Sequence, residues 1–327
     1  MNITIKNGSL DFTVNIEKLT QLCGFDIIKK DYIIDSIYKH FSLYKYNEYE
    51  ENMIDNVLIN GEKASRSDYI CFYIDRREDL ISQFKLTKQS ILSKIINTKL
   101  QLYNFNNEIN ELSIAINNLY EKMNNLLPFE NIKFSYDIEN ISEIGNEMKI
   151  VSIDEEDVSS ISNYELLISF LKILGDYNQS FNVKTILVVK NIDHLINKEE
   201  YLKIVDYISE EFKNKDIIVI STISLPNYAI INKETVLGLN VINDIIFQFP
   251  EVEIIESFIN NYYPINMNCS FVDIEEYLKR IVHYIGSNAV KYGLKWQVLL
   301  KMFNNSLKID VDNEIMCSEI EKKYIYN

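Results

Sequence analysis

A stretch near the start of the chain half-matches the loop that holds nucleotide phosphates in P-loop proteins. That loop follows the pattern Gly-x-x-x-x-Gly-Lys-Ser/Thr, in which backbone N–H groups and the lysine bind phosphate and the hydroxyl binds Mg²⁺. The sequence from Gly24 to Asp31 is GFDIIKKD. Gly24 and Lys30 match the pattern, whereas Lys29 replaces the second glycine and Asp31 replaces the hydroxyl residue. Half a motif arises easily by chance, so on its own it is weak evidence.

Each departure from the pattern works against phosphate binding. Glycines let backbone N–H groups curl around a phosphate in conformations that side chains resist, but bulky Phe25, Ile27 and Ile28 fill this loop. We expect Asp31 to lie at the start of the following helix, where its carboxylate satisfies the helix dipole and repels phosphate. The sequence therefore predicts a degenerate nucleotide loop formed by Gly24, Lys29, Lys30 and Asp31.

The second half of a nucleotide site is altered as well. In P-loop ATPases a buried strand ends in acidic residues that hold Mg²⁺ and position water. Here the apolar strand at residues 186–189 is followed by Lys190 and Asn191, and the nearest acid is Asp193. We expect Asp193 to cap the short helix that follows. The pattern favours a scaffold without ATP hydrolysis, while an active P-loop ATPase of the chromosome-segregation or transporter type remains the alternative.

Positive charge is concentrated between residues 76 and 99, in a chain whose net charge is −15. That net charge opposes DNA binding, because nonspecific affinity comes mainly from Lys and Arg neutralising phosphates. A basic stripe in an acidic protein is what a duplex-DNA channel would require, although a solvated helix face is the alternative. Lys85, Lys88 and Lys99 could share one helical face. The candidate DNA-binding residues are Arg76, Arg77, Lys85, Lys88, Lys94 and Lys99.

Carboxylates are the only candidate metal ligands. Four cysteines and three histidines are scattered along the chain without zinc-site spacing. Ca²⁺ takes several carboxylate oxygens, but no EF-hand spacing is present, and a solvated acidic loop is the alternative. We therefore expect no required cofactor, with calcium as a possible one. The candidate calcium ligands are Asp137, Glu139, Asp154 and Glu155.

Several elements would position these residues. Asn7-Gly8 lies between two alternating segments and predicts a β-hairpin, and helical spacing of apolar residues follows up to position 41. Apolar strands at 184–189 and 216–222, with a helix between them, indicate a parallel βαβ unit buried on both faces. The fold class predicted is α/β, with a degenerate P-loop ATPase-like core and a parallel sheet.

Two helical parts are expected outside that core. No Gly or Pro occurs between residues 62 and 127, which favours a long α-helical hairpin. The predicted domains are the core at 1–75 and 160–250, the helical subdomain at 76–159, and a helical C-terminal extension at 251–327. Apolar residues of the hairpin repeat at spacings of four and three, as in a coiled coil. These residues are Leu112, Ile116, Leu119, Met123 and Leu126.

Neither a membrane span nor a signal peptide is expected. No run of eighteen apolar residues occurs. The first residues alternate like a strand and lack the charged and apolar regions of a signal. We therefore expect a cytoplasmic protein with no membrane partner.

Several stretches resemble the long form of the spacer-acquisition proteins of type II-A CRISPR systems. The resemblance implies a homotetrameric ring with a lysine-lined channel, which binds ends of linear double-stranded DNA independently of sequence. It further implies no catalytic activity, and partners in the CRISPR integrase complex and the effector nuclease. Shorter family members bind Ca²⁺ in the acidic region, whereas a C-terminal extension could tie subunits together instead. The stretches are LTQLCG (19–24), NVLI (56–59), KNIDHLI (190–196), NDIIF (243–247) and NNYYPIN (260–266).

A ring would answer the objection raised by the negative charge. Four copies would focus a few lysines inward, and contacts to phosphate carry no base information. An acidic interaction scaffold with no DNA role is the remaining alternative.

Overall fold

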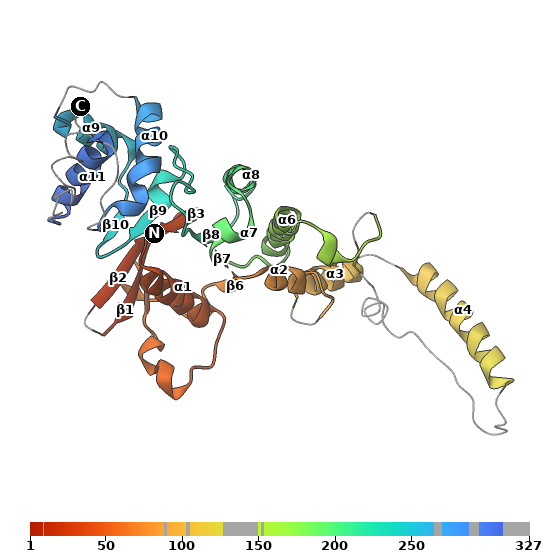
Figure 1. The fold of residues 1–327 in the computed structure, drawn as a ribbon. Coiled ribbons are helices and arrows are strands. Elements are labelled where there is room, and N and C mark those ends of the chain that lie inside the picture. Colours follow the sequence, from red (N-terminus) through yellow and green to blue (C-terminus); the bar gives the residue numbers. More distant parts are fainter. Residues whose placement is uncertain are drawn as a thin grey trace. The chain divides into compact units, whose positions relative to one another are not determined.

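The protein divides into two compact units in its computed structural model (Figure 1). An α/β unit comprises Met1–Asp75 and Val183–Asn327, and a helical unit comprises Arg76–Asn182. The structure describes residues 1–8, 10–87, 90–102, 105–126, 150–151, 154–264, 270–287 and 294–309.

A six-stranded sheet forms the centre of the α/β unit, with the strand order β10-β9-β3-β8-β7-β6. β3 pairs in parallel with β8 and β9, β7 pairs in parallel with β6 and β8, and β10 runs antiparallel to β9. The parallel pairing expected for the two apolar strands is therefore confirmed as β7 and β8. The strands are β3 (Leu19–Cys23), β6 (Ile70–Ile74), β7 (Thr185–Val189), β8 (Ile217–Thr222), β9 (Leu239–Ile242) and β10 (Ile246–Gln248).

A second, antiparallel sheet has the strand order β2-β1-β4-β5. Its hairpin confirms the prediction from Asn7-Gly8, but Asn7 still pairs with Leu10, so the turn begins at Gly8. Gly8 has a φ of 62°, a left-handed conformation that glycine adopts without strain. The strands are β1 (Asn2–Asn7), β2 (Leu10–Asn15), β4 (Val57–Ile59) and β5 (Glu62–Lys63).

Helix α1 (Ile27–Phe41) shares one hydrophobic core with both sheets. Ile33 and Ile37 of this helix belong to the same buried cluster as Ile3 of β1 and Ile220 of β8, and all four side chains are fully buried. Each such side chain contributes roughly 1.5–3 kcal/mol of hydrophobic stabilisation. The core therefore fixes the position of α1 directly after β3.

The C-terminal helices belong to the α/β unit and do not form a separate extension at 251–327. Aromatic packing is one reason, because the Phe303 ring of α11 lies 5.9 Å from that of Phe247 on β10 and 5.2 Å from that of Phe258 on α9. The remaining helices of this unit are η1 (Glu48–Met53), α7 (Ile192–Leu195), α8 (Lys198–Glu211), η3 (Val236–Gly238), α9 (Val252–Tyr262), α10 (Phe271–Ile281), η4 (Val282–Tyr284) and α11 (Leu294–Ser306).

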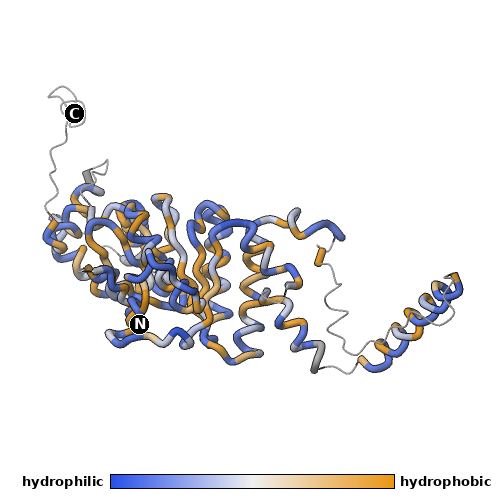
Figure 2. Tube along the Cα trace, turned by 90° about the horizontal axis from the view of Figure 1, so that it is seen from below, coloured by the Kyte–Doolittle hydropathy of each residue, from blue (hydrophilic) through white to orange (hydrophobic). Residues whose placement is uncertain are grey.

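The helical unit is built around α6, which packs against α2 and α3. Residues 160–182 were predicted to lie in the core, but α6 buries Leu167 and Phe170 within the helical unit instead. Along α4, apolar and polar residues are interleaved (Figure 2). In the stretch 62–127, where a long helical hairpin was expected, the structure describes the three helices α2, α3 and α4. The elements are α2 (Arg77–Gln83), α3 (Ile91–Leu102), α4 (Asn106–Asn124), η2 (Val158–Ser160) and α6 (Asn163–Phe181).

In the part of the chain that the structure describes, no helix combines the length and the apolar character needed to cross a lipid bilayer.

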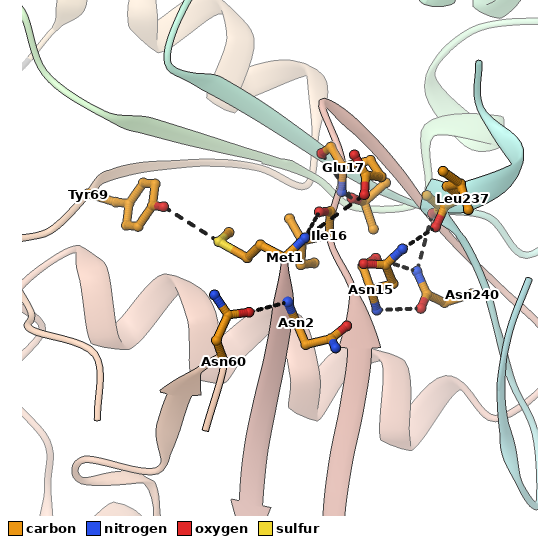
Figure 3. A network of polar contacts seen from close by, with 11 residues as sticks. Met1, Asn2, Asn15, Ile16, Glu17, Asn60, Tyr69, Leu237 and Asn240 are labelled. Carbon is orange, nitrogen blue, oxygen red and sulfur yellow. Dashed lines mark hydrogen bonds and ion pairs between the residues drawn. The ribbon is translucent and has the colours of Figure 1, made fainter. Parts of the chain in front are cut away.

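Two asparagines connect the small sheet to the large one (Figure 3). The backbone N–H of Asn15 donates to Asn240 Oδ1, and Asn240 Nδ2 donates to the Asn15 carbonyl, both at 2.8 Å. Asn15 Nδ2 also donates to the Leu237 carbonyl at 2.7 Å. Asn240 is fully buried, so water cannot replace these contacts.

The substitution Asn240→Ala should lower the free energy of unfolding by about 2–4 kcal/mol. The reason is that it leaves both backbone groups of Asn15 without their partner in a partly buried place. Urea unfolding of the full chain measures the effect. Asn214→Ala, at an exposed position, is the matched control and should stay within about 0.5 kcal/mol of the native protein. Equal midpoints for the two variants would contradict the prediction.

Candidate functional site

The turn from β3 into α1 lies at the carboxyl edge of the parallel strands, where α/β proteins commonly bind ligands. Gly24 begins this turn with a φ of 100°. A Cβ atom on Gly24 would lie 2.3 Å from the carbonyl oxygen of Ile242 at the end of β9. The backbone N–H of Asp26 donates to the same oxygen at 3.2 Å. Glycine is therefore required because the turn lies directly against β9.

Helix α1 begins at Ile27, and its N-cap is Asp26. The Asp26 carboxylate accepts a 2.9 Å hydrogen bond from the Lys29 backbone N–H. Burial alone would raise the pKa of Asp26, but its hydrogen bonds and ion pair with Lys29 hold that pKa below its usual value. The expectation that Asp31 lies at the helix N-terminus is wrong, because Asp26 caps the helix and Asp31 falls in the second turn.

Backbone donors that could face a phosphate already have acceptors within the chain. Phosphate-binding loops leave such N–H groups pointing into an open cradle. Phe25 N–H donates to Asn243 Oδ1 at 2.7 Å, and Asn243 itself is held by donating to the His283 and Ile285 carbonyls. The N–H groups of Asp26, Ile27, Lys29 and Lys30 donate to acceptors of the chain as well. The turn in this conformation therefore has few free backbone N–H groups with which to bind an anion.

The Lys30 ammonium is turned into the protein. Its side chain is 1% exposed, and Nζ donates to the carbonyls of Gly24 and Ile223, both at 2.8 Å. Burial lowers the pKa of Lys30, partly offset by the nearby Cys23 and Asp193. Burial likewise raises the pKa of the Cys23 thiol to about 12, so this thiol stays protonated. Lys30 thus bridges the ends of β3 and β8.

The neighbouring Lys29 fastens the turn on its other side. Lys29 Nζ donates to the carbonyl of Asn243 at 2.7 Å and lies 2.9 Å from the Asp26 carboxylate. A third contact reaches the Asp244 carbonyl at 3.3 Å. The residue that replaces the second glycine of the phosphate-binding pattern therefore clamps the turn to the segment after β9.

A second group of contacts lies at the end of β7. Lys190 Nζ forms a 2.9 Å ion pair with Asp31, so β7 is tied to α1. The expectation that Asp193 caps its own helix is wrong, because the N-cap of α7 is Asn191. The Asp193 carboxylate instead accepts from the backbone N–H groups of Ser224, at 2.8 Å, and of Leu225, at 2.5 Å. It therefore holds the loop that follows β8.

Two of the predicted DNA-binding residues are engaged inside the helical unit. The Arg77 guanidinium donates to the carbonyls of Ser159 and Ile161, both at 2.6 Å, and to the Asn163 side chain. Lys99 Nζ forms a 2.8 Å ion pair with Asp176, in which both side chains are more than half exposed. Such an exposed pair contributes only about 0–1 kcal/mol. Arg77 therefore holds the segment around η2 and the start of α6 in place. Lys99, in contrast, can leave Asp176 and bind another anion.

Arg76, Lys85 and Lys94 are exposed. Lys94 Nζ lies 5.8 Å from the centre of the Tyr177 ring. Lys88 lies outside the described residues. The single helical face expected for Lys85, Lys88 and Lys99 is wrong, because α2 ends at Gln83 and α3 begins only at Ile91. The exposed cations are therefore distributed over separate segments of the helical unit.

Of the predicted calcium ligands, Asp154 and Glu155 are exposed, whereas Asp137 and Glu139 lie outside the described residues. The nearby Asp157 caps η2 by accepting from the Ser159 N–H at 2.8 Å. Within the described ranges no group of three or more His, Cys, Asp or Glu side chains is arranged to hold a metal ion. Calcium binding at this region remains a prediction.

Comparison with known proteins identifies the fold. No family model matches the chain, and no curated protein matches it. Among solved structures, the chain is similar to Stu0660 of Streptococcus thermophilus, with a TM-score of 0.81 and 19% sequence identity. The match covers 99% of this chain and 100% of that one. At this level of identity, the two chains share a fold over their whole length.

Lys30 gives the stability of the protein a characteristic pH dependence. Its pKa is lower in the folded than in the unfolded chain, so above the folded value the unfolded state binds more protons. The free energy of unfolding therefore rises with pH up to the unfolded pKa of about 10.4, by at most about 1.4 kcal/mol per pH unit.

The substitution Lys30→Met should remove this rise, because methionine fills similar space without titrating. Urea unfolding at pH 7 and at about pH 10.4 should show the native protein gaining stability relative to the variant as pH rises. Lys213→Met, at an exposed position, is the control and should leave the native slope intact. Parallel pH profiles for native protein and Lys30→Met would show that Lys30 is not held as described.

Proposed function

We propose that the protein binds the ends of linear double-stranded DNA without catalysis and independently of base sequence. It would act as a homotetrameric ring during spacer acquisition in CRISPR antiviral defence, beside the integrase complex and the effector nuclease. The observation that carries the proposal is how the cations are distributed. At the β3–α1 turn, the ammonium groups of Lys29 and Lys30 donate hydrogen bonds to backbone carbonyls. In the helical unit, by contrast, Arg76, Lys85 and Lys94 are exposed. The sequence resemblance supports the assembly and its partners.

The β3–α1 turn is, in this proposal, a P-loop that has closed on itself. P-loop proteins hold Mg²⁺ between a hydroxyl after the lysine and an acid at the end of a nearby strand. The corresponding positions here are Asp31 and the residues after β7, and Lys190 Nζ pairs with Asp31 at 2.9 Å. A lysine ammonium thus supplies the positive charge that a metal ion would bring. No cofactor is needed for DNA binding in this scheme.

Charge also bears on how DNA would be bound. A net charge of −15 repels DNA from most of the surface, so binding depends on a few exposed cations facing a common space. Lysine and arginine contacts to phosphate fix position but carry no base information. The proposed mode is therefore sequence-independent and strongly weakened by salt.

The ring predicts a preference for DNA ends. Linear duplex should be retarded in a gel at low salt, whereas the same DNA as a relaxed closed circle should be retarded far less, because a closed circle has no end to thread. Cutting the circle once should restore binding. Equal retardation of circle and linear forms would rule out threading, and no retardation of either would favour the acidic scaffold.

Charge reversal in the helical unit tests which cations matter. Lys85→Glu combined with Lys94→Glu should weaken binding of linear duplex at least about tenfold and reduce its salt dependence, because phosphate contacts are lost. The matched control is Lys213→Glu with Lys233→Glu, two exposed lysines of the α/β unit, which should bind almost as the native protein does. Mg²⁺-dependent ATP turnover that disappears in Lys30→Met would instead establish the alternative, an active ATPase.

A further inference from the structure

Helix α4 (Asn106–Asn124) has no buried residue. Apolar side chains nevertheless run along one side of it at alternating spacings of three and four. Leu112 is 37% exposed, Leu119 is 56% exposed and Met123 is 41% exposed, while Ile109 and Ile116 are partly exposed. We call Ile109, Leu112, Ile116, Leu119 and Met123 the α4 seam.

The exposed seam is where α4 could gain stability by packing. In proteins, most helical stability comes from burying one apolar face rather than from intrinsic propensity. Ile114 lies on the other side of the helix and is 62% exposed. The regularly spaced apolar residues of α4 are therefore those of the seam. Covering this seam would bury five large side chains at once.

Charge argues against DNA as the occupant of the seam. The charged residues of α4 are three acids and one base. A phosphate backbone would meet mainly negative side chains here, and nonspecific DNA binding requires the opposite. These residues are Glu108, Glu111, Glu121 and Lys122.

The seam has the pattern of a coiled coil. In heptad notation, isoleucine or methionine takes the a positions and leucine takes the d positions, which is the apolar repeat of a coiled coil. Small residues, Ser113 and Ala115, flank the middle of the seam. A second copy of the same helix therefore fits it, because an interface around a twofold axis needs a self-complementary surface.

The two charged flanking positions select the antiparallel arrangement. Glu108 and Lys122 occupy equivalent g positions at opposite ends of α4. When two copies run antiparallel with Ile109 of one opposite Leu119 of the other, Glu108 of each copy meets Lys122 of the other. When they run parallel, Glu108 meets Ser113 and no opposite charges pair. Antiparallel pairing thus gives two interchain ion pairs at the rim of the seam.

We propose that the α4 seam pairs two copies of this chain as an antiparallel coiled coil, with Ile109 of one copy opposite Leu119 of the other. The proposal deepens the proposed function, because it names one of the surfaces that would build its ring. It does not depend on DNA binding itself. A contact of this kind would connect the helical units of two subunits.

Substitution of the seam tests whether it carries the assembly. Light scattering of the full chain should give a multiple of the 38.5 kDa subunit mass. In Leu112→Glu with Leu119→Glu the measured mass should fall by half, because this contact joins subunits in pairs. Ile114→Glu, on the other side of the same helix, is the control and should keep the native mass. A monomeric native protein, or a seam variant of unchanged mass, would overturn the proposal.

Exchanging the charges of Glu108 and Lys122 tests whether the two helices run antiparallel. Restored association in the double variant would also show that the single variants had not simply misfolded. Glu108→Lys alone and Lys122→Glu alone should each weaken the association severalfold, because each places like charges together. The double exchange should restore it. Within one helix the two positions are about 21 Å apart, so restoration requires a second copy. Failure of the double exchange to restore the association would overturn the antiparallel pairing.

DNA binding measured on the same samples separates the two ideas. Native protein that assembles through the seam but fails to bind linear duplex would leave the seam standing and contradict the proposed function. Native protein that binds linear duplex, while the seam variant keeps its full mass, would contradict the seam alone.

Discussion

A lysine ammonium held by two backbone carbonyls is the contact on which the β3–α1 turn depends. Lys30 Nζ bonds Gly24 on one strand end and Ile223 after another, so it draws β3 and β8 together at the edge of the sheet where a ligand would enter. A buried ammonium is tolerated only where it is well hydrogen-bonded. Because one carbonyl belongs to the turn itself and the other follows β8, Lys30 holds the turn closed against the end of β8.

The surrounding substitutions follow from that arrangement. Once Lys30 faces inward, Asp26 can cap α1, and Lys29 can join the turn to the segment after β9. Asp31, now in the second turn of the helix, meets Lys190 at the end of β7. Each of these contacts satisfies a charged or polar group from within the chain itself. Such a corner gains rigidity at the edge of the sheet where α/β proteins commonly bind ligands.

Sequence patterns predicted the elements of this fold better than their contacts. The hairpin at Gly8 and the two apolar parallel strands could be predicted because turn residues and unbroken apolar runs are local signals. The position of Asp26 could not be deduced from apolar periodicity, which starts at Ile33, although an aspartate directly before the first helical residue is a capping signal. The role of Asp193 depends on a loop more than thirty residues later in the chain, and no local pattern encodes such a contact.

The basic stretch shows why spacing alone misplaces charges. Lys85 and Lys99 share a helical face only if one helix continues through both, and a break between α2 and α3 removes that condition. Arg77 has the positive charge that DNA binding requires, but its guanidinium already donates hydrogen bonds to three acceptors in the helical unit. The apolar repeat of α4 behaves differently, because Leu112, Ile116, Leu119 and Met123 lie within one continuous helix, whereas the predicted Leu126 lies beyond the end of that helix at Asn124. Periodicity is a dependable guide to which residues share a face where a single element carries the pattern, and it loses that value where the pattern crosses from one element to the next.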